Sequence, residues 1–301
     1  MAERNWSSRS IGSKLQHAIF RVFIRVGGYP AAYCLLFWVV LWYTLLPSVR
    51  KRSAPYRNRM FPEDTGLKQW VHCMRLHREL GKVLVDRAVT GISGKFSVRS
   101  SVEEGDLIKN LHAEGKGLIL LTAHIGYWQM AARCLHEYVA SPVNILLHRD
   151  EGDNDKHFFE YGANDYGIRI IDPKDGPASA VMLLQALQRG EVVALMGDRT
   201  YGNDAHTVKA QFLGGEVPLP YSAYRLAASS GAPVVITFAF RERPGAARHE
   251  IAAVIRVPEN SGRGGKTYFS YAEQFASSME DAVHKEPYQF FNFYDMWEQT
   301  R

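Results

Sequence analysis

The stretch Gly117-Leu-Ile-Leu-Leu-Thr-Ala-His-Ile-Gly-Tyr-Trp-Gln129 decides how this chain is expected to fold. It begins with a glycine and a short apolar run, which is typical of a strand buried on both faces of a sheet. His124 follows this run closely, and residues 124–138 are predicted to form a helix. A buried strand that leads through a polar residue into a helix is the repeating unit of α/β proteins.

The same alternation of strands and helices continues along the chain. Short apolar runs predict further strands at 143–147, 169–171, 192–196, 233–239 and 249–257, the last of them at an edge of the sheet. Helices are predicted at 64–88, 158–166, 178–189 and 221–230. We therefore predict an α/β fold with a mixed, largely parallel central sheet and helices on both of its faces.

Polar residues follow two of the predicted strands. His124 comes after the first, and Asp198-Arg199 comes after the strand that ends at Met196. In open α/β sheets, ligands bind at the carboxyl ends of the strands. We therefore expect these two clusters to share one site.

The chemistry of these side chains leaves several roles open. Neutral imidazole accepts a proton from an alcohol or amine near pH 7, so His124 is a candidate general base, although capping of the local backbone fits its position equally well. Arg199 could bind phosphate through two hydrogen bonds, and Asp198 could orient a base or hold Arg199. The alternative for this pair is a surface salt bridge. Gly214, in the turn Phe212-Leu-Gly-Gly215, would allow close approach of a ligand, or it lies in an ordinary loop.

The N-terminal part of the chain is predicted to associate with a membrane. Residues 31–46 carry no charge, and Trp38, Trp42 and Tyr43 within them suit a position at a membrane interface. As a helix this run would measure roughly 24 Å, against a hydrocarbon core of roughly 30 Å. A span, a partly inserted helix and a buried core helix all fit, and basic residues on both flanks leave the orientation open. Residues 11–26 are predicted to form a basic amphipathic helix, and residues 49–62 a linker. We divide the chain into membrane-anchoring helices at 1–48 and a catalytic domain at 49–301.

The composition narrows the class of protein. The chain has 301 residues, 46% of them hydrophobic and 22% charged, with a net charge of +5, so a folded protein with an anionic partner is expected. Its three cysteines are far apart, which indicates neither a zinc site nor a disulfide framework. A serine hydrolase is disfavoured because no G-x-S-x-G motif occurs. Nothing beyond the charge suggests nucleic-acid binding.

Four ordered segments together resemble the bacterial late acyltransferases of lipid A biosynthesis, within the lysophospholipid acyltransferase superfamily. The first is Gly117–Trp128, with its strand, His, Gly and Trp. The second is Leu187-Gln-Arg-Gly-Glu-Val-Val-Ala-Leu-Met-Gly-Asp-Arg199. The third is Phe212-Leu-Gly214, and the fourth is Leu226-Ala-Ala-Ser-Ser-Gly-Ala-Pro-Val-Val235. The aromatic segment Pro287–Trp297 resembles the tail of one branch of these enzymes.

The resemblance implies an enzyme of the bacterial inner membrane whose catalytic domain is on the cytoplasmic face. Such an enzyme moves a fatty acyl chain from acyl carrier protein or acyl-CoA to a membrane lipid or glycolipid, with no metal and no further cofactor. His124 would act as the base. Arg199 and Gly214 would bind the polar head of the acceptor, and Trp128 and Arg149 would also contact substrate.

The main departure from the family pattern lies five residues after His124. The pattern is His, four residues, then Asp or Glu, and here the last position is Gln129. A glutamine can hydrogen-bond the imidazole, but it cannot stabilise its cationic form by charge. Three interpretations remain: Asp198 supplies the carboxylate, Gln129 acts as a weaker orienting residue, or the chain is a catalytically impaired lipid-binding membrane protein. We expect an active enzyme.

Overall fold

The computed structural model of the protein describes residues 14–128, 135, 138–148, 167–199, 206–259, 261–262 and 264–297. Several predictions fall outside these residues. They are the helix at 158–166, most of the helix at 124–138, and the two candidate site residues Gln129 and Arg149.

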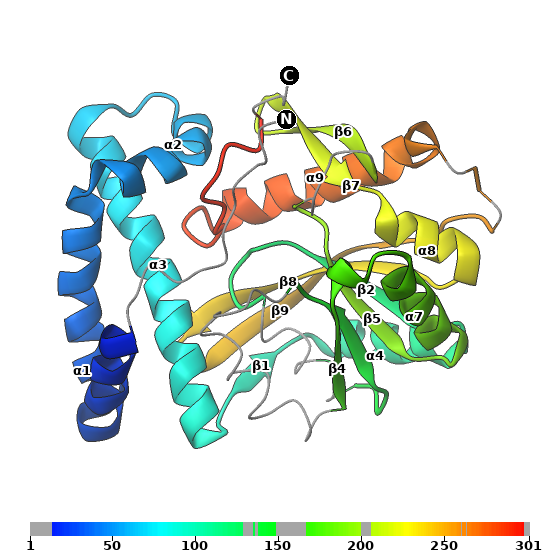
Figure 1. The fold of residues 1–301 in the computed structure, drawn as a ribbon, viewed down its shortest axis with the longest axis horizontal. Coiled ribbons are helices and arrows are strands. Elements are labelled where there is room, and N and C mark those ends of the chain that lie inside the picture. The colour runs from blue at the N-terminus through cyan, green and yellow to red at the C-terminus, as the bar shows by residue number, and fades with distance from the viewer. Residues whose placement is uncertain are drawn as a thin grey trace.

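The described strands form a seven-stranded sheet and a separate two-stranded hairpin (Figure 1). The order in the larger sheet is β1-β9-β8-β2-β5-β3-β4, and β8, β2, β5, β3 and β4 are mutually parallel. The only antiparallel pairing among these strands joins β8 to β9. The strands are β1 Ser97–Arg99, β2 Leu118–Thr122, β3 Val143–Leu146, β4 Ile168–Ile171, β5 Val192–Met196, β6 Thr207–Phe212, β7 Gly215–Pro220, β8 Val234–Arg243 and β9 Ala246–Ile255. The prediction of a mixed, largely parallel sheet is confirmed.

The strand predicted at 249–257 is present as part of β9, but its predicted place at the edge of the sheet is wrong. β9 lies between β8 and β1, and β1 forms the edge through parallel pairing with residues 246–248. β1 has only three residues and no apolar pattern, so its sequence carries no strand signal. Its place in the sheet comes from pairing with β9.

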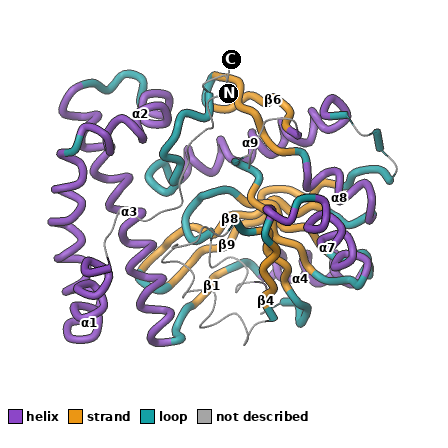
Figure 2. Tube along the Cα trace, viewed as in Figure 1, coloured by secondary structure: helices purple, strands orange, loops and turns teal. Residues whose placement is uncertain are grey.

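Helices cover both faces of the sheet, as predicted (Figure 2). Leu118 and Leu120 of β2 pack with the α4 side, where Ile108 is buried. Ile119 and Leu121 point the other way, into the larger core that includes buried side chains of α7, α8 and α9. β2 is therefore buried on both faces, which explains its uninterrupted apolar run. These helices are α4 Val102–Ala113, α7 Pro177–Gln188, α8 Ser222–Ser230 and α9 Phe269–Lys285, with short 3-10 turns at Pro173–Asp175 and Gly265–Tyr268.

Three of the described helices precede the sheet: α1 Lys14–Leu45, α2 Pro47–Met60 and α3 Gly66–Ser93. α1 is kinked at Gly28, whose φ of 59° is left-handed. Within the described residues, the stretch Val22–Leu45 is long and apolar enough to cross a membrane. The predicted linker at 49–62 is wrong, because these residues form α2. Pro47 occupies its first turn, where proline is tolerated, and the buried Arg57 ties α2 to α3 through Gln69.

Candidate active site

The central pairing of the sheet brings the two predicted polar clusters together. β2 and β5 are adjacent and parallel, with Thr122 opposite Met196, so both strands end at the same edge. The pairing continues one residue further, because the Gly197 amide donates to the Thr122 carbonyl at 2.8 Å. Asp198 follows Gly197 directly, and His124 lies two residues after Thr122.

His124 and Asp198 form a close pair. Both carboxylate oxygens of Asp198 lie 2.9 Å from Nδ1 of His124, and one of them also accepts the His124 backbone N–H at 3.3 Å. The Asp198 side chain is fully buried, whereas the His124 side chain keeps 13% of its surface exposed. An ionised carboxylate only accepts hydrogen bonds, so Nδ1 carries the proton and Nε2 is the basic nitrogen of the ring. This tautomer is the one a general base requires.

Burial and charge both act on this pair. Burial lowers the pKa of His124, and the nearby Arg199 guanidinium lowers it further, against the opposing effect of Asp198. Burial alone would raise the pKa of Asp198, but His124 and Arg199 outweigh it, and the pKa falls below its usual value. At neutral pH the pair is therefore a neutral imidazole held by a carboxylate.

The loop that carries His124 is not helical over 124–128, so the start of the helix predicted for 124–138 is wrong. Its backbone bonds lead to distant segments instead of to the next helical turn. The Gly126 amide donates to Gln289 at 2.8 Å, and the Tyr127 amide donates to Ala239 at 2.6 Å. Gly126 has a φ of 55°, and a Cβ there would lie 2.2 Å from the Ala239 carbonyl oxygen. Only glycine fits this position.

The C-terminal segment 286–297 supplies contacts that the sequence did not predict. The Phe291 amide donates to the His124 carbonyl at 2.8 Å, and Arg199 Nη2 donates to the Phe291 carbonyl at 2.7 Å. The Tyr294 hydroxyl donates to the Asp198 carbonyl at 3.3 Å, and Arg199 lies over the Tyr294 ring. The clustered aromatic residues of this segment were the one available signal. Residues 286–297 thus position both halves of the site.

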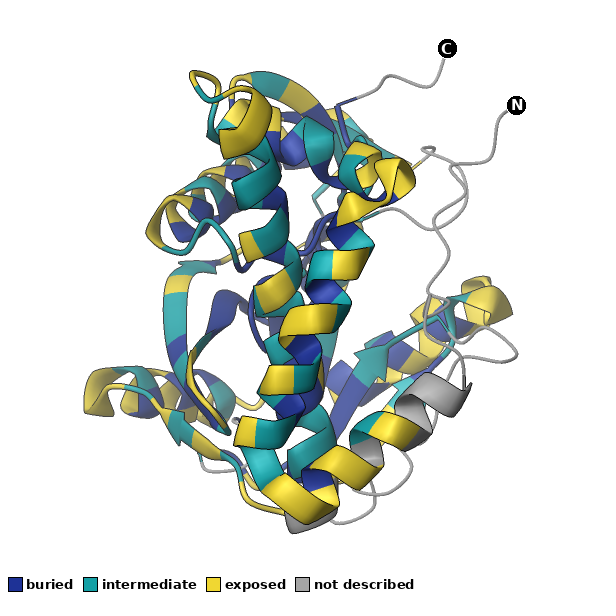
Figure 3. Ribbon diagram, turned by 90° about the vertical axis from the view of Figure 1, so that its left-hand side faces the viewer, coloured by how far each residue is buried: buried dark blue, intermediate teal, exposed yellow. Residues whose placement is uncertain are grey.

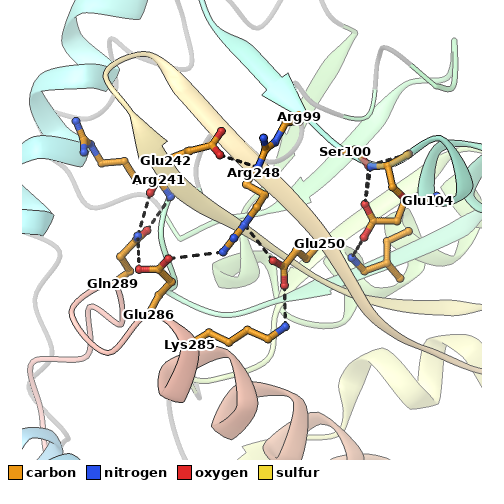
Figure 4. A network of polar contacts seen from close by, with 12 residues as sticks. Arg99, Ser100, Glu104, Arg241, Glu242, Arg248, Glu250, Lys285, Glu286 and Gln289 are labelled. Carbon is orange, nitrogen blue, oxygen red and sulfur yellow. Dashed lines mark hydrogen bonds and ion pairs between the residues drawn. The ribbon is translucent and has the colours of Figure 1, made fainter.

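A polar network fixes this segment to β8 and β9 (Figure 4). The side chain of Gln289 bonds both main-chain groups of Arg241, accepting from its N–H at 2.7 Å and donating to its carbonyl at 3.0 Å. Nearby, Arg248 of β9 pairs with Glu250 and Glu286. Gln289 is also the residue whose carbonyl holds Gly126. The network therefore links the sheet to the His124 loop.

A buried ionic cluster around Asp86 holds the loop that carries His124. Asp86 of α3 is fully buried and accepts hydrogen bonds from the hydroxyls of Tyr33 on α1 and Tyr127 in the loop. Arg241 Nε donates to the same carboxylate at 2.7 Å. Burial, reinforced by Asp86, raises the pKa of Tyr127, so its phenol remains a donor. Tyr127 is three residues from His124, and α1 is thereby connected to the candidate site.

The remaining predicted residues are placed as follows. The Trp128 ring lies 5.4 Å from the His124 ring and 5.5 Å from Phe291, forming an aromatic wall beside the imidazole. Gly214 is exposed at the tip of the β6–β7 hairpin, and the neighbouring Leu213 carbonyl accepts from Arg59 of α2. Within the described residues, no cluster of three or more His, Cys, Asp or Glu side chains is arranged to hold a metal ion.

A buried carboxylate–histidine pair at the carboxyl ends of two adjacent parallel strands defines an α/β protein suited to general-base chemistry. The model of the bacterial lipid A biosynthesis acyltransferase family matches residues 67–299. The chain belongs to this family, which confirms the resemblance, and it is an acyltransferase. No curated protein matches the chain.

Proposed function

We propose that the protein moves a fatty acyl chain from acyl carrier protein or acyl-CoA to a membrane lipid or glycolipid of the lipid A type, with His124 as general base. The observation that carries this proposal is the pairing of the buried Asp198 with Nδ1 of His124 at 2.9 Å. It provides the carboxylate that Gln129 lacks. Of the three interpretations left open by the sequence, this geometry favours Asp198 as the orienting residue.

The chemical step follows from the tautomer. His124 Nε2 takes the proton of an acceptor hydroxyl or amine as its oxygen or nitrogen attacks the thioester carbonyl. The tetrahedral intermediate collapses, the carbon–sulfur bond breaks, and the thiolate takes the proton back from the imidazolium. Asp198 stabilises the imidazolium by charge during this step. No acyl-enzyme intermediate is required.

Four further residues are proposed to bind substrate. Arg199 and Gly214 would hold the polar head of the acceptor, and Trp128 and Arg149 would contact the acyl chain or the donor. Trp128 beside Phe291 offers an apolar surface next to His124, which suits an acyl chain. Arg199 is held by the Phe291 carbonyl and by Asp198, so it is already ordered for an anionic group.

The proposed location is the cytoplasmic face of the inner membrane, where both donors and the lipid acceptor would meet. The apolar stretch Val22–Leu45 supports membrane association. The basic composition of α2, which contains five Lys or Arg residues and no acid, supports contact with anionic lipid or with an acidic carrier protein.

The direct test is transfer of radiolabelled acyl groups from each donor in membranes that contain the protein, followed by mass spectrometry of the lipid extract. His124→Ala should abolish the labelled product while the protein accumulates normally. His284→Ala, at an exposed position on α9, is the matched control and should retain full transfer.

Undiminished transfer by His124→Ala would overturn the base assignment. A wild-type protein that binds the acceptor lipid and yields no acylated product with either donor would favour the catalytically impaired lipid-binding protein instead.

A further inference from the structure

Helix α1 carries no charged residue from Val26 to Leu45, and among the described residues protein covers one side of this stretch. Ile24, Ala32, Leu36 and Val40 are buried against α3. The opposite side, called the outer face here, consists of Phe37, Trp38, Trp42 and Leu45, which are 48%, 62%, 65% and 53% exposed. Figure 3 looks onto these helices, and exposed positions follow the outward side. An exposed apolar stripe of this size marks a surface that contacts a lipid or a partner.

α1 is fixed along α3 through most of its apolar length (Figure 1). Near the middle of this stretch, the Tyr33 hydroxyl donates to Asp86. One turn further, Leu36 packs so closely on Gly81 that a Cβ there would lie 2.3 Å from its Cδ1. Near its end, Trp70 Nε1 donates to the Thr44 carbonyl at 3.3 Å. The two helices therefore run antiparallel and side by side.

α3 carries charged residues along the length that packs against the apolar stretch of α1. Between Trp70 and Asp86 lie Arg75, Arg78 and Lys82, and the side chain of Arg78 is 47% exposed. An α1 that crossed the bilayer upright while docked on α3 would carry these charges into the hydrocarbon, where they are strongly disfavoured. An upright α1 would have to leave α3, and that movement would break the Tyr33–Asp86 bond beneath the His124 loop.

We propose that α1 lies in the plane of the membrane while docked on α3, with its outer face immersed in the interface of a bilayer that contains anionic phospholipids. This proposal rests on the membrane association proposed above and specifies its geometry. Tryptophans at 38 and 42 suit the depth of the headgroups. The exposed Lys51 and Arg52, at the start of α2 directly after the outer face, supply the charge complementary to the lipid phosphates.

Spin labels on the outer face distinguish the two geometries. Four singly labelled variants are made, all of them without Cys134. One is labelled at Cys34, and the other three also lack Cys34 and are labelled at Trp38→Cys, Trp42→Cys or Leu45→Cys. Depth is measured by power saturation in vesicles of phosphatidylethanolamine and phosphatidylglycerol. We expect one shallow depth for all four labels. An upright helix would instead give a gradient of roughly 16 Å from the first label to the last, and that gradient would overturn the proposal.

Labels that remain as accessible to water as in the absence of vesicles would also overturn it, because the outer face would then belong to a protein partner or a second copy. A Leu36→Cys/Gly81→Cys disulfide gives an independent result. The locked protein should keep its vesicle binding and label depths, whereas an upright insertion requires undocking and would be lost on oxidation.

Charge is tested by binding to the same vesicles. Lys51→Gln/Arg52→Gln should weaken binding roughly fivefold per removed charge. Lys109→Gln/Lys116→Gln, at exposed positions on α4 and just after it, should leave binding unchanged. Equal binding by both variants would contradict the anionic-lipid contact. None of these measurements involves acyl transfer, so a wrong membrane geometry and a wrong catalytic proposal would give different results.

Discussion

Replacing Asp198 with asparagine tests the central pair of the proposed site. The carboxylate is fully buried and touches Nδ1 of His124 through both oxygens at 2.9 Å. An asparagine keeps the shape of the side chain but removes the charge. Its amide can donate to Nδ1, which would move the imidazole proton to Nε2 and block the proposed base.

The expected loss is set by two effects. A hydrogen bond to a charged group contributes about 1.5–3 kcal/mol, which corresponds to a rate loss of roughly 10- to 150-fold. A switched tautomer costs more, and in serine proteases the same carboxylate-to-amide change lowers kcat about 10⁴-fold. We therefore expect acyl transfer by Asp198→Asn to fall between about 10² and 10⁴-fold.

The assay is the initial rate of labelled acyl transfer at saturating donor, with the melting temperature measured in parallel. Asp106→Asn, on the exposed surface of α4, is the matched control and should behave as wild type. Gln129→Ala is the comparison for the competing orienting residue and should cost less than tenfold. A folded Asp198→Asn protein with more than half of the wild-type rate would refute the assignment of Asp198.

Three further predictions concern the surroundings of this pair. Asp86→Ala leaves the buried Arg241 without its carboxylate partner, so the free energy of unfolding, measured by chemical denaturation, should fall by about 3–5 kcal/mol. A smaller decrease would contradict the buried Asp86–Arg241 ion pair. Gly126→Ala places a Cβ 2.2 Å from the Ala239 carbonyl oxygen at a φ of 55°, so it should lower the free energy of unfolding by roughly 2 kcal/mol or more. Acyl transfer by the protein that remains folded should also be reduced. Wild-type stability of this variant would contradict the conformation of the loop at Gly126. Burial lowers the pKa of His124, so Nε2 stays unprotonated as pH falls through neutrality, and kcat/KM should decline only below about pH 6.5. A decline of kcat/KM that begins above this pH would contradict the lowered pKa. Asp198→Asn removes the carboxylate that raises the His124 pKa, so the decline should then begin at still lower pH.

Much of the fold could be predicted from local pattern. Strands β2, β5 and β8 are buried on both faces, so their sequences contain uninterrupted apolar runs, and the short length of these runs favours strands over helices. The same burial explains why the strand ends, with His124 and Asp198, stood out as polar interruptions. α3 was also predictable, because its apolar residues recur at helical spacing on both of its packed sides.

Other elements depend on partners that are distant in sequence. β1 has no strand pattern and exists because β9 offers it an edge. Residues 49–62 were predicted to be a basic linker, yet most of them form α2, which packs on α3 with Arg57 buried between the two helices. Hydrogen bonds from Arg57 to Gln69 and to the Arg50 carbonyl offset the cost of burying its charge. Local propensity does not contain these interactions.

The sequence by itself determined that His124 and Asp198 lie at strand ends of one α/β sheet, since strand burial is written in local apolar pattern. It could not determine which residue orients the imidazole, because Gln129 and Asp198 were both available. Only the tertiary structure decided the pairing, through the adjacency of β2 and β5, which sets Thr122 opposite Met196 and brings residues 74 positions apart to 2.9 Å. Adjacency of strands is a property of the whole sheet, so it is absent from either segment alone.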